Sequence, residues 1–455
     1  MVEQKDINQC FGNFLFPNIF KLFRIAIQPG RLLTAFLALC IIFVTGWIMD
    51  FSKTVVVSGK VSARELRSSV LTGSVTWPTE LHCFVNNVNN PDRTDGFIKT
   101  YKDRTVNERL GVFEVFSNYC LANFNAAVVS LLQLKLDMVT AAVLSCVMSC
   151  VWVLKYHTIY GIIFLLISLV VFSITGGAIC RGAALQLSKN EKPGIGPCLK
   201  FALKRFLPLF FAPTAPVILV ALLGLVIIFM LGLTTNIPWV GELILALFFI
   251  IILFAGLLMT FTVIEAGAGI NLMFGAIAYD NSDTFDAISR SFNYVYLRPW
   301  RLAFYTLLAA VYGSICYLFV RFFAFVLLSI SRWFLQLGIF AQSSKAPQFN
   351  KLAVIWPSPD FFNLLGNGLD FSRSPTELIA AFVIYLVILV ISGLVLAFAV
   401  SFYFSAGSVI YCLLRNKVDN IAIGNVFIET EQMIQPDNAG QSEQPAQVAN
   451  QEQTG

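Results

Sequence analysis

Long apolar runs alternate with short polar segments along most of this chain. Six runs contain a single charged residue between them, Arg321, and lie at about 32–48, 159–179, 209–231, 243–264, 302–327 and 378–400. At 1.5 Å per residue, a helix formed by any of these runs can cross roughly 30 Å of hydrocarbon. The pattern predicts an all-α integral membrane protein with six transmembrane helices. The first falls within 32–50 and the other five lie in a helical membrane core over 159–414.

The polar region 51–158 separates the first two predicted helices. Its segment 55–76 is rich in Val, Thr and Ser with interspersed Gly, a composition that favours short strands. Turn residues follow at 87–92. We therefore expect a small outer-face domain with some β-structure here.

Both ends of the chain are more polar. Residues 1–31 predict an amphipathic N-terminus, in which a helix over 19–28 has an apolar and a basic side. The apolar side would carry Phe20, Phe23 and Ile27, and the basic side Lys21 and Arg24. Residues 415–455 begin as a basic segment. From Gln435 they become a tail rich in Gln, Asn, Ala and Glu, which predicts disorder.

The segment 138–156 is also apolar enough to span a membrane, so hydropathy alone counts seven helices. Charge distinguishes the two counts, because basic loops stay in the cytoplasm. The most basic short loop, 181–208, would face outward with seven spans and faces the cytoplasm with six. We expect six spans, a membrane-associated 138–156 that does not span, and both termini in the cytoplasm. Seven spans remain the alternative.

Two stretches of the chain align without a gap when one is shifted by 91 residues. The aligned pairs are Gly176 with Gly267, Phe201 with Phe292, and Pro208 with Pro299. Each stretch contains an incoming span, small residues, a basic amphipathic segment, a proline and an outgoing span. A third copy is split between Ala406-Gly407 and Pro29-Gly30-Arg31-Leu32. The pattern predicts three helical hairpins connected by cytoplasmic interfacial amphipathic helices, with chance convergence as the alternative.

Composition supports a membrane protein and limits the partners. Of 455 residues, 57% are hydrophobic and 13% charged, whereas soluble domains carry roughly a quarter charged residues. Mean hydropathy is +0.75. The net charge of +5 is small and spread along the chain, which indicates basic cytoplasmic loops and not a nucleic-acid surface. We expect the cell membrane as the location and membrane lipids as partners, with other membrane proteins as further candidates and no nucleic acid.

Basic residues gather in the two predicted interfacial segments: Lys200, Lys204 and Arg205 in one, Arg290 and Arg298 in the other. Anionic lipid headgroups attract such residues, each contributing about 1 kcal/mol near the surface. These five are candidate headgroup contacts. The simpler interpretation is that their charges only determine topology.

Glu265 ends a long apolar run beside Gly267 and Gly269. Carboxylates inside membranes are costly and often functional, so Glu265 and the nearby Asn271 are the candidate transport site. The simpler interpretation is that Glu265 reaches the interface and only caps its helix. Arg321 is the charged residue inside the fifth predicted transmembrane run. Its simpler, non-functional interpretation is that the side chain extends along the helix to the lipid headgroups.

Cysteine and histidine offer little chemistry. Cys83 and Cys120 share the region 51–158, and an oxidising compartment would permit a disulfide between them. With two His in the chain and no CxxC pair, we expect neither a metal nor another cofactor. No catalytic motif occurs, so we expect no enzymatic activity.

One motif carries a resemblance. The segment 283–292, DTFDAISRSF, followed by Arg298-Pro299-Trp300, is an Ala-containing and aromatic amphipathic helix with Arg just before an outgoing span. Over about 159–420 the chain resembles uncharacterised bacterial six-span membrane proteins. These include the membrane domain that precedes the catalytic domain of some glycerophosphodiesterases. The resemblance implies architecture only, because no catalytic domain is attached here.

These observations favour a non-enzymatic integral membrane protein that acts as a scaffold, a lipid-interacting factor or an accessory subunit. A transporter or permease subunit with a site near Glu265 is the alternative.

Overall fold

The computed structural model describes residues 16–59, 79–102, 109–345, 347–366 and 374–427. Helices make up 81% of these residues, and no strand occurs among them. Within these described ranges, eight helices are long and apolar enough to cross a membrane. They are α3 (Pro29–Met49), α7 (Val112–Leu132), α8 (Leu136–Tyr156), α9 (Thr158–Lys189), α11 (Phe206–Ile227), α12 (Gly241–Asp280), α14 (Pro299–Gly338) and α16 (Pro375–Val418). An all-α, multi-pass membrane protein fits this arrangement.

Shorter helices connect or cover the long ones. Those at the N-terminus are η1 (Phe16–Lys21) and α2 (Leu22–Ala26), and those in the region before α7 are α5 (Glu80–Asn86) and α6 (Pro91–Tyr101). The remaining ones are α10 (Ile195–Lys204), η3 (Ile228–Gly232), η4 (Thr234–Asn236), α13 (Thr284–Leu297) and α15 (Lys351–Ile355).

The helix α7 was not expected from the sequence, which placed these residues in the polar outer region. It packs antiparallel to α8, and the two are joined by residues 133–135. If α7 and α8 both cross the membrane, the chain returns to the side from which it started. Every later loop therefore lies on the same side of the membrane whether both helices cross it or neither does. The seven-span alternative counted α8 without a partner helix, and the structure supplies that partner.

The expected β-structure is wrong for the described residues. Only isolated bridges occur there, joining Val55 to Leu110 and Val57 to Thr79. Residues 60–78, which carry most of the strand prediction, and the tail from Gln435 lie outside the described residues. At the N-terminus, η1 and α2 bury Ile19, Leu22, Ile25 and Ala26. The apolar side expected there is different, because Phe20 and Ile27 are exposed.

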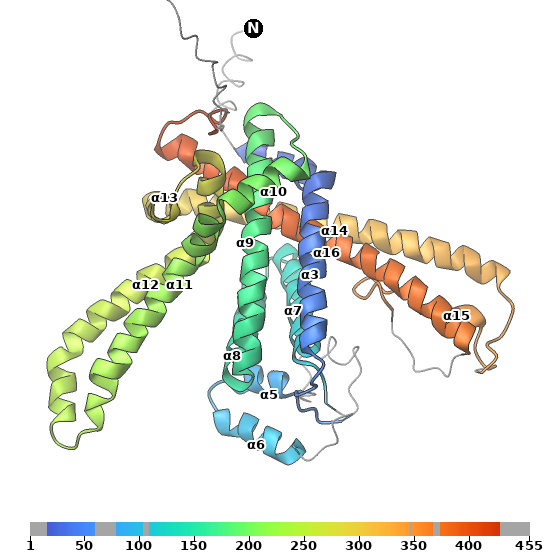
Figure 1. Ribbon diagram of the computed structural model, residues 1–455, viewed down its shortest axis with the longest axis horizontal. Helices are drawn as coiled ribbons and strands as arrows, with labels where there is room; N and C mark the ends of the chain where they lie inside the picture. The colour runs from blue at the N-terminus through green and yellow to red at the C-terminus, as the bar shows by residue number, and fades with distance from the viewer. Residues whose placement is uncertain (1–15, 60–78, 103–108, 346, 367–373, 428–455) are drawn as a thin grey trace, which may run out of the picture.

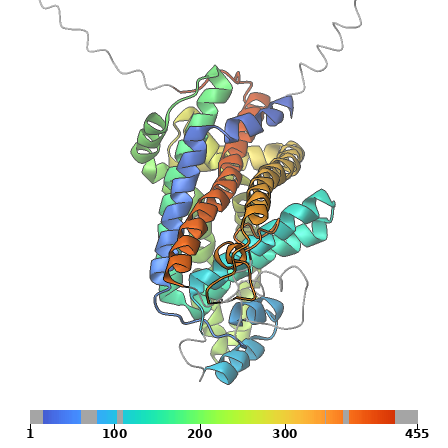
Figure 2. The same cartoon turned by 90° about the vertical axis from the view of Figure 1, so that its right-hand side faces the viewer.

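Three long hairpins diverge from one packed end of the molecule (Figure 1). They are α3 with α9, α11 with α12, and α14 with α16. Figure 2 shows α3 and α16 lying side by side, so the first and the last long helix of the chain are in contact. The short helices α10 and α13 lie at the packed end, whereas α5 and α6 lie at the opposite end (Figure 1).

The packed end, which we call the hub, consists of residues 175–189 of α9, 265–280 of α12 and 401–418 of α16. Most of its side chains are buried. Two glycines allow the helices to approach. A Cβ on Gly176 would lie 2.5 Å from the Phe404 ring, and one on Gly275 would lie 2.6 Å from the Tyr411 Cβ. Any side chain at either position would force the helices apart.

Two of the three hub helices end in the same way. Both α9 and α12 stop at an asparagine in the left-handed conformation, Asn190 and Asn281, where asparagine is tolerated better than most residues. Proline then opens α3 and α14 at their first position, since a first-turn N–H has no helical partner.

Candidate functional site

Asp280 is the centre of an ionic network at the end of α12. Its Oδ1 accepts from the Arg415 guanidinium (2.9 Å), and its Oδ2 accepts from Arg290 (2.9 Å) and from the Tyr411 hydroxyl (2.5 Å). The carboxylate thereby joins α12, α13 and α16. Asp280 and Arg415 are both about nine-tenths buried, so each needs the other to offset the cost of desolvation.

Arg290 also bonds Asp286, one turn earlier on α13, with Nε 2.9 Å from Oδ1. Burial alone would lower the pKa of the Arg290 guanidinium, but its hydrogen bond to Asp286 and the neighbouring Tyr411 and Asp280 raise it overall. The guanidinium therefore stays charged. Its part in contacting headgroups stays a prediction, and the structure adds a role in holding α13 against the hub.

The segment that follows α16 folds back over the hub. Arg181 donates to the carbonyls of Ala278 and Phe427, each at 2.7 Å, and Arg415 donates to the Asn425 carbonyl at 2.7 Å. The Phe427 amide in turn donates to the Tyr279 carbonyl at 2.8 Å. Hydrogen bonds from the two arginines and from the Phe427 amide thus hold residues 419–427 against the three hub helices.

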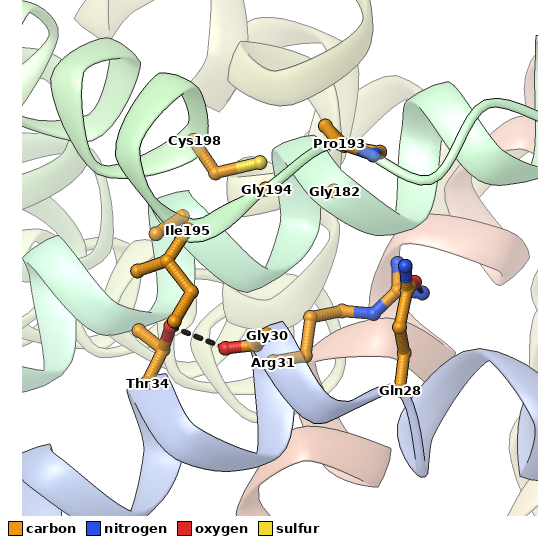
Figure 3. Close-up of a pocket in the computed structure, with 10 residues that line it drawn as sticks. Gln28, Gly30, Arg31, Thr34, Gly182, Pro193, Gly194, Ile195 and Cys198 are labelled. Atoms are coloured by element: carbon orange, nitrogen blue, oxygen red, sulfur yellow. Dashed lines mark hydrogen bonds between the residues drawn. The ribbon is translucent and has the colours of Figure 1, made fainter.

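A recess lies beside the hub, where α3, α9 and α10 meet (Figure 3). Its wall includes Arg31, Thr34, Gly182 and Cys198. Arg31 is 5% exposed, and its Nη2 donates to the side chains of Gln28 and Gln186. Burial raises the pKa of the Cys198 thiol, while the nearby Arg31 and Arg181 act in the opposite direction.

Glu265 is fully buried, and neither of its carboxylate oxygens has a hydrogen-bond partner. The Ser291 hydroxyl of α13 lies beside it over Gly269, but donates to the Gly269 carbonyl at 3.0 Å. The simpler interpretation from the sequence, a carboxylate at an exposed helix end, does not describe this side chain. The structure encloses it between α12 and α13.

Asn271 lies on a different interface from Glu265. Its amide donates to the Tyr403 carbonyl of α16 (2.9 Å), and its side chain packs against Gly407. The structure therefore does not bring the two candidate transport residues together.

The other predicted headgroup contacts differ in exposure. Lys200, Lys204 and Arg298 are exposed, whereas Arg205 is half-buried. Lys200 and Lys204 lie on α10, whose opposite side buries Cys198 and Ala202 against α9. These two exposed lysines lie at the hub end of the molecule, a position that is compatible with contact to lipid headgroups.

The predicted bridge between Cys83 and Cys120 is not formed, and both thiols are free. Cys83 is buried in α5, where its Sγ lies 3.9 Å from the Arg93 carbonyl. Cys120 faces α8, with its Sγ 3.4 Å from the Ser149 hydroxyl. Helices α5 and α7 do meet, with the His82 and Tyr119 rings 5.1 Å apart, but the neighbouring thiols of Cys83 and Cys120 contact different residues.

Arg321 does not extend to an interface. It is 5% exposed and donates to Asn125 of α7 (3.0 Å), to Tyr317 (2.6 Å) and to the Phe361 carbonyl (2.7 Å). The sequence does not predict this cluster, because Asn125 falls in the polar region 51–158. The hub network was missed too, since no local pattern links Asp280 to Arg415.

Among the described residues, no group of three His, Cys, Asp or Glu side chains is placed to hold a metal ion. Comparison of the chain with protein-family models, curated proteins and solved structures gave no match.

Proposed function

We propose that this chain is a non-enzymatic multi-pass membrane protein that interacts with lipids around a cytoplasmic hub. The observation that carries the proposal is the separation of the hairpins beyond the hub. None of the most apolar 18-residue stretch of α12 is buried, and Leu247 and Ile250 are 75% and 79% exposed. Apolar faces of this extent require a covering, and lipid chains supply one.

Topology and repeats belong to the same proposal. With both termini in the cytoplasm, the exposed Lys200, Lys204 and Arg298 lie at the level of anionic headgroups. The left-handed Asn190 and Asn281, 91 residues apart, support the internal repeat, because each is followed by a short helix and then by an outgoing long helix. The resemblance to six-span bacterial membrane proteins concerns this architecture alone.

Lipids that remain bound after mild detergent extraction test the proposal. We expect the purified protein to retain anionic phospholipids above their share of the membrane, as measured by mass spectrometry. Replacing Lys200, Lys204 and Arg298 together with Gln should reduce this enrichment. The matched control replaces Lys99, Lys102 and Lys351 with Gln, because these basic residues lie away from the hub. A lipid content equal to that of the surrounding membrane would contradict the proposal.

The second candidate function is transport, and Glu265 favours it. A fully buried carboxylate without a partner is expected to bind a proton or a cation when it is used. Proton or monovalent-cation flux in vesicles containing the purified protein tests this candidate. Flux that exceeds empty vesicles and disappears in Glu265→Gln would support transport, and equal flux in both proteins would remove it.

A further inference from the structure

Arg31 carries a buried charge that its neighbours satisfy only in part. Its Nη2 donates to two glutamine side chains, but Nε and Nη1 have no hydrogen-bond partner. Among the described residues no carboxylate forms an ion pair with it. A guanidinium that is 5% exposed ordinarily has an anionic partner.

Two helix N-termini meet beside this arginine. The helix α3 begins at Pro29 and α10 begins at Ile195, and a Cβ on Gly30 would lie 3.9 Å from the Ile195 backbone nitrogen. The helix dipole makes each N-terminus favourable for negative charge. Because Pro29 and Pro197 have no N–H and the Arg31 amide donates to the Gln28 carbonyl, the first-turn donors are the amides of Gly30 on α3 and of Ile195 and Gly196 on α10. The N-cap residues Gln28 and Gly194 provide no side-chain hydrogen bond to either helix.

Glycine keeps the recess open. A Cβ on Gly182 would lie 3.5 Å from both Arg31 Nη1 and Cys198 Sγ, so a methyl group fits there in ordinary contact. The recess has room for about one water molecule, and therefore for one oxygen of a larger anion positioned at its mouth.

An apolar path leads away from the recess along α3. Thr34 lines the recess, and Leu37, Ile41, Val44 and Ile48 follow it on the same side of the helix. Between 50% and 61% of each of these four side chains is exposed. A phospholipid whose phosphate lies at the recess can therefore place an acyl chain along this side of α3.

We propose that the recess between α3, α9 and α10 binds a phosphate group, whose source is the headgroup of an anionic membrane phospholipid. One phosphate oxygen accepts from the unpaired Arg31 Nη1, the guanidinium nitrogen that lies nearest Gly182, and the two helix N-termini stabilise the remaining charge. This inference rests on the proposed lipid interaction and assigns it a specific site.

Binding to the purified full-length protein in a neutral detergent tests the site. Short-chain phosphatidylglycerol and inorganic phosphate are titrated separately, and the shift of the thermal unfolding midpoint reports binding to the folded state. Gly182→Ala fills the recess without a clash, and Arg31→Gln removes the charge. The matched control is Arg24→Gln, which removes an exposed charge from the same N-terminal region.

We expect phosphatidylglycerol to stabilise the wild-type protein and Arg24→Gln equally, with affinity at least about tenfold weaker in Gly182→Ala and Arg31→Gln. Inorganic phosphate should stabilise the wild type less than the lipid does. Equal stabilisation by phosphate alone would overturn the lipid as the source. If Arg31→Gln does not fold, Gly182→Ala decides the question, and an unchanged affinity in that variant overturns the site. Enrichment of anionic lipid that persists in Gly182→Ala would leave the proposed function standing without this recess.

Discussion

The Arg415 guanidinium lies 2.9 Å from the Asp280 carboxylate, and this contact joins the ends of α16 and α12 inside the hub. Both side chains are about nine-tenths buried, and Tyr411 and Arg290 complete the carboxylate's hydrogen bonds. The pair is thus a structural connection between two of the three hairpins.

Replacing Asp280 with Asn should destabilise the protein strongly. The change leaves the buried Arg415 charge without its counter-ion, which costs about 3–5 kcal/mol in other proteins. The free energy of unfolding in detergent, measured by denaturant titration, reports the effect. Glu191→Gln is the control, because it removes an exposed carboxylate near the same end. Equal stability of the two variants would contradict the structural role of the pair.

Gly407→Ala should also lower the unfolding free energy, by about 1–3 kcal/mol. The added Cβ would lie 2.2 Å from the Asn271 Oδ1 and force α12 and α16 apart. Gly267→Ala is the matched control on α12, since no atom lies within 4 Å of the added Cβ. We expect that variant to unfold at or slightly above the wild-type midpoint, because alanine favours helix. The opposite ranking would show that the two helices do not meet at Gly407.

Glu265→Gln should leave expression and stability unchanged or slightly improved. The carboxylate has no hydrogen-bond partner to lose, and a neutral amide is less costly to bury. Yield and thermal midpoint are the measurements, with Glu242→Gln as an exposed control on the same helix. A clear loss of stability in Glu265→Gln alone would show that the carboxylate has an essential partner.

The orientation of the hub can be tested with single cysteines in a protein whose native cysteines are replaced. Lys192→Cys lies between α9 and α10, and Lys351→Cys lies between α14 and α16; both positions are exposed. In intact cells, an impermeant maleimide should label residue 351 at once and residue 192 only after permeabilisation. Labelling of residue 192 in intact cells would reverse the proposed topology.

Uninterrupted apolar runs made six of the eight long helices predictable, and a seventh, α8, was identified as an ambiguous segment. The helix α7 was missed because Asn118, Asn123 and Asn125 interrupt its apolar sequence. Asn125 is used inside the protein, where it accepts from Arg321 at 3.0 Å. Local polarity therefore suggested solvent exposure where the structure has a buried polar contact between α7 and α14.

The candidate site was less accessible from the sequence. The sequence predicts small-residue clusters at the helix ends, but Gly176 packs against Phe404 and Phe274 whereas the aligned Gly267 faces open space. The contacts of Arg181 with Ala278 and Phe427 span 97 and 246 residues of sequence. Such pairings depend on how the hairpins converge, which no local periodicity encodes.

The unbroken length of α12, α14 and α16 has a mechanical consequence. At 1.5 Å per residue, a helix of 40 residues is about 60 Å long, roughly twice the thickness of the hydrocarbon layer. Each helix therefore extends without a break from the part that spans the membrane to an end in or beside the hub. A thinner bilayer increases helix tilt, and an arm that tilts must turn the part of the helix beyond the membrane by the same angle. We therefore expect a change of bilayer thickness to act on the contact between Asp280 at the end of α12 and Arg415 at the end of α16.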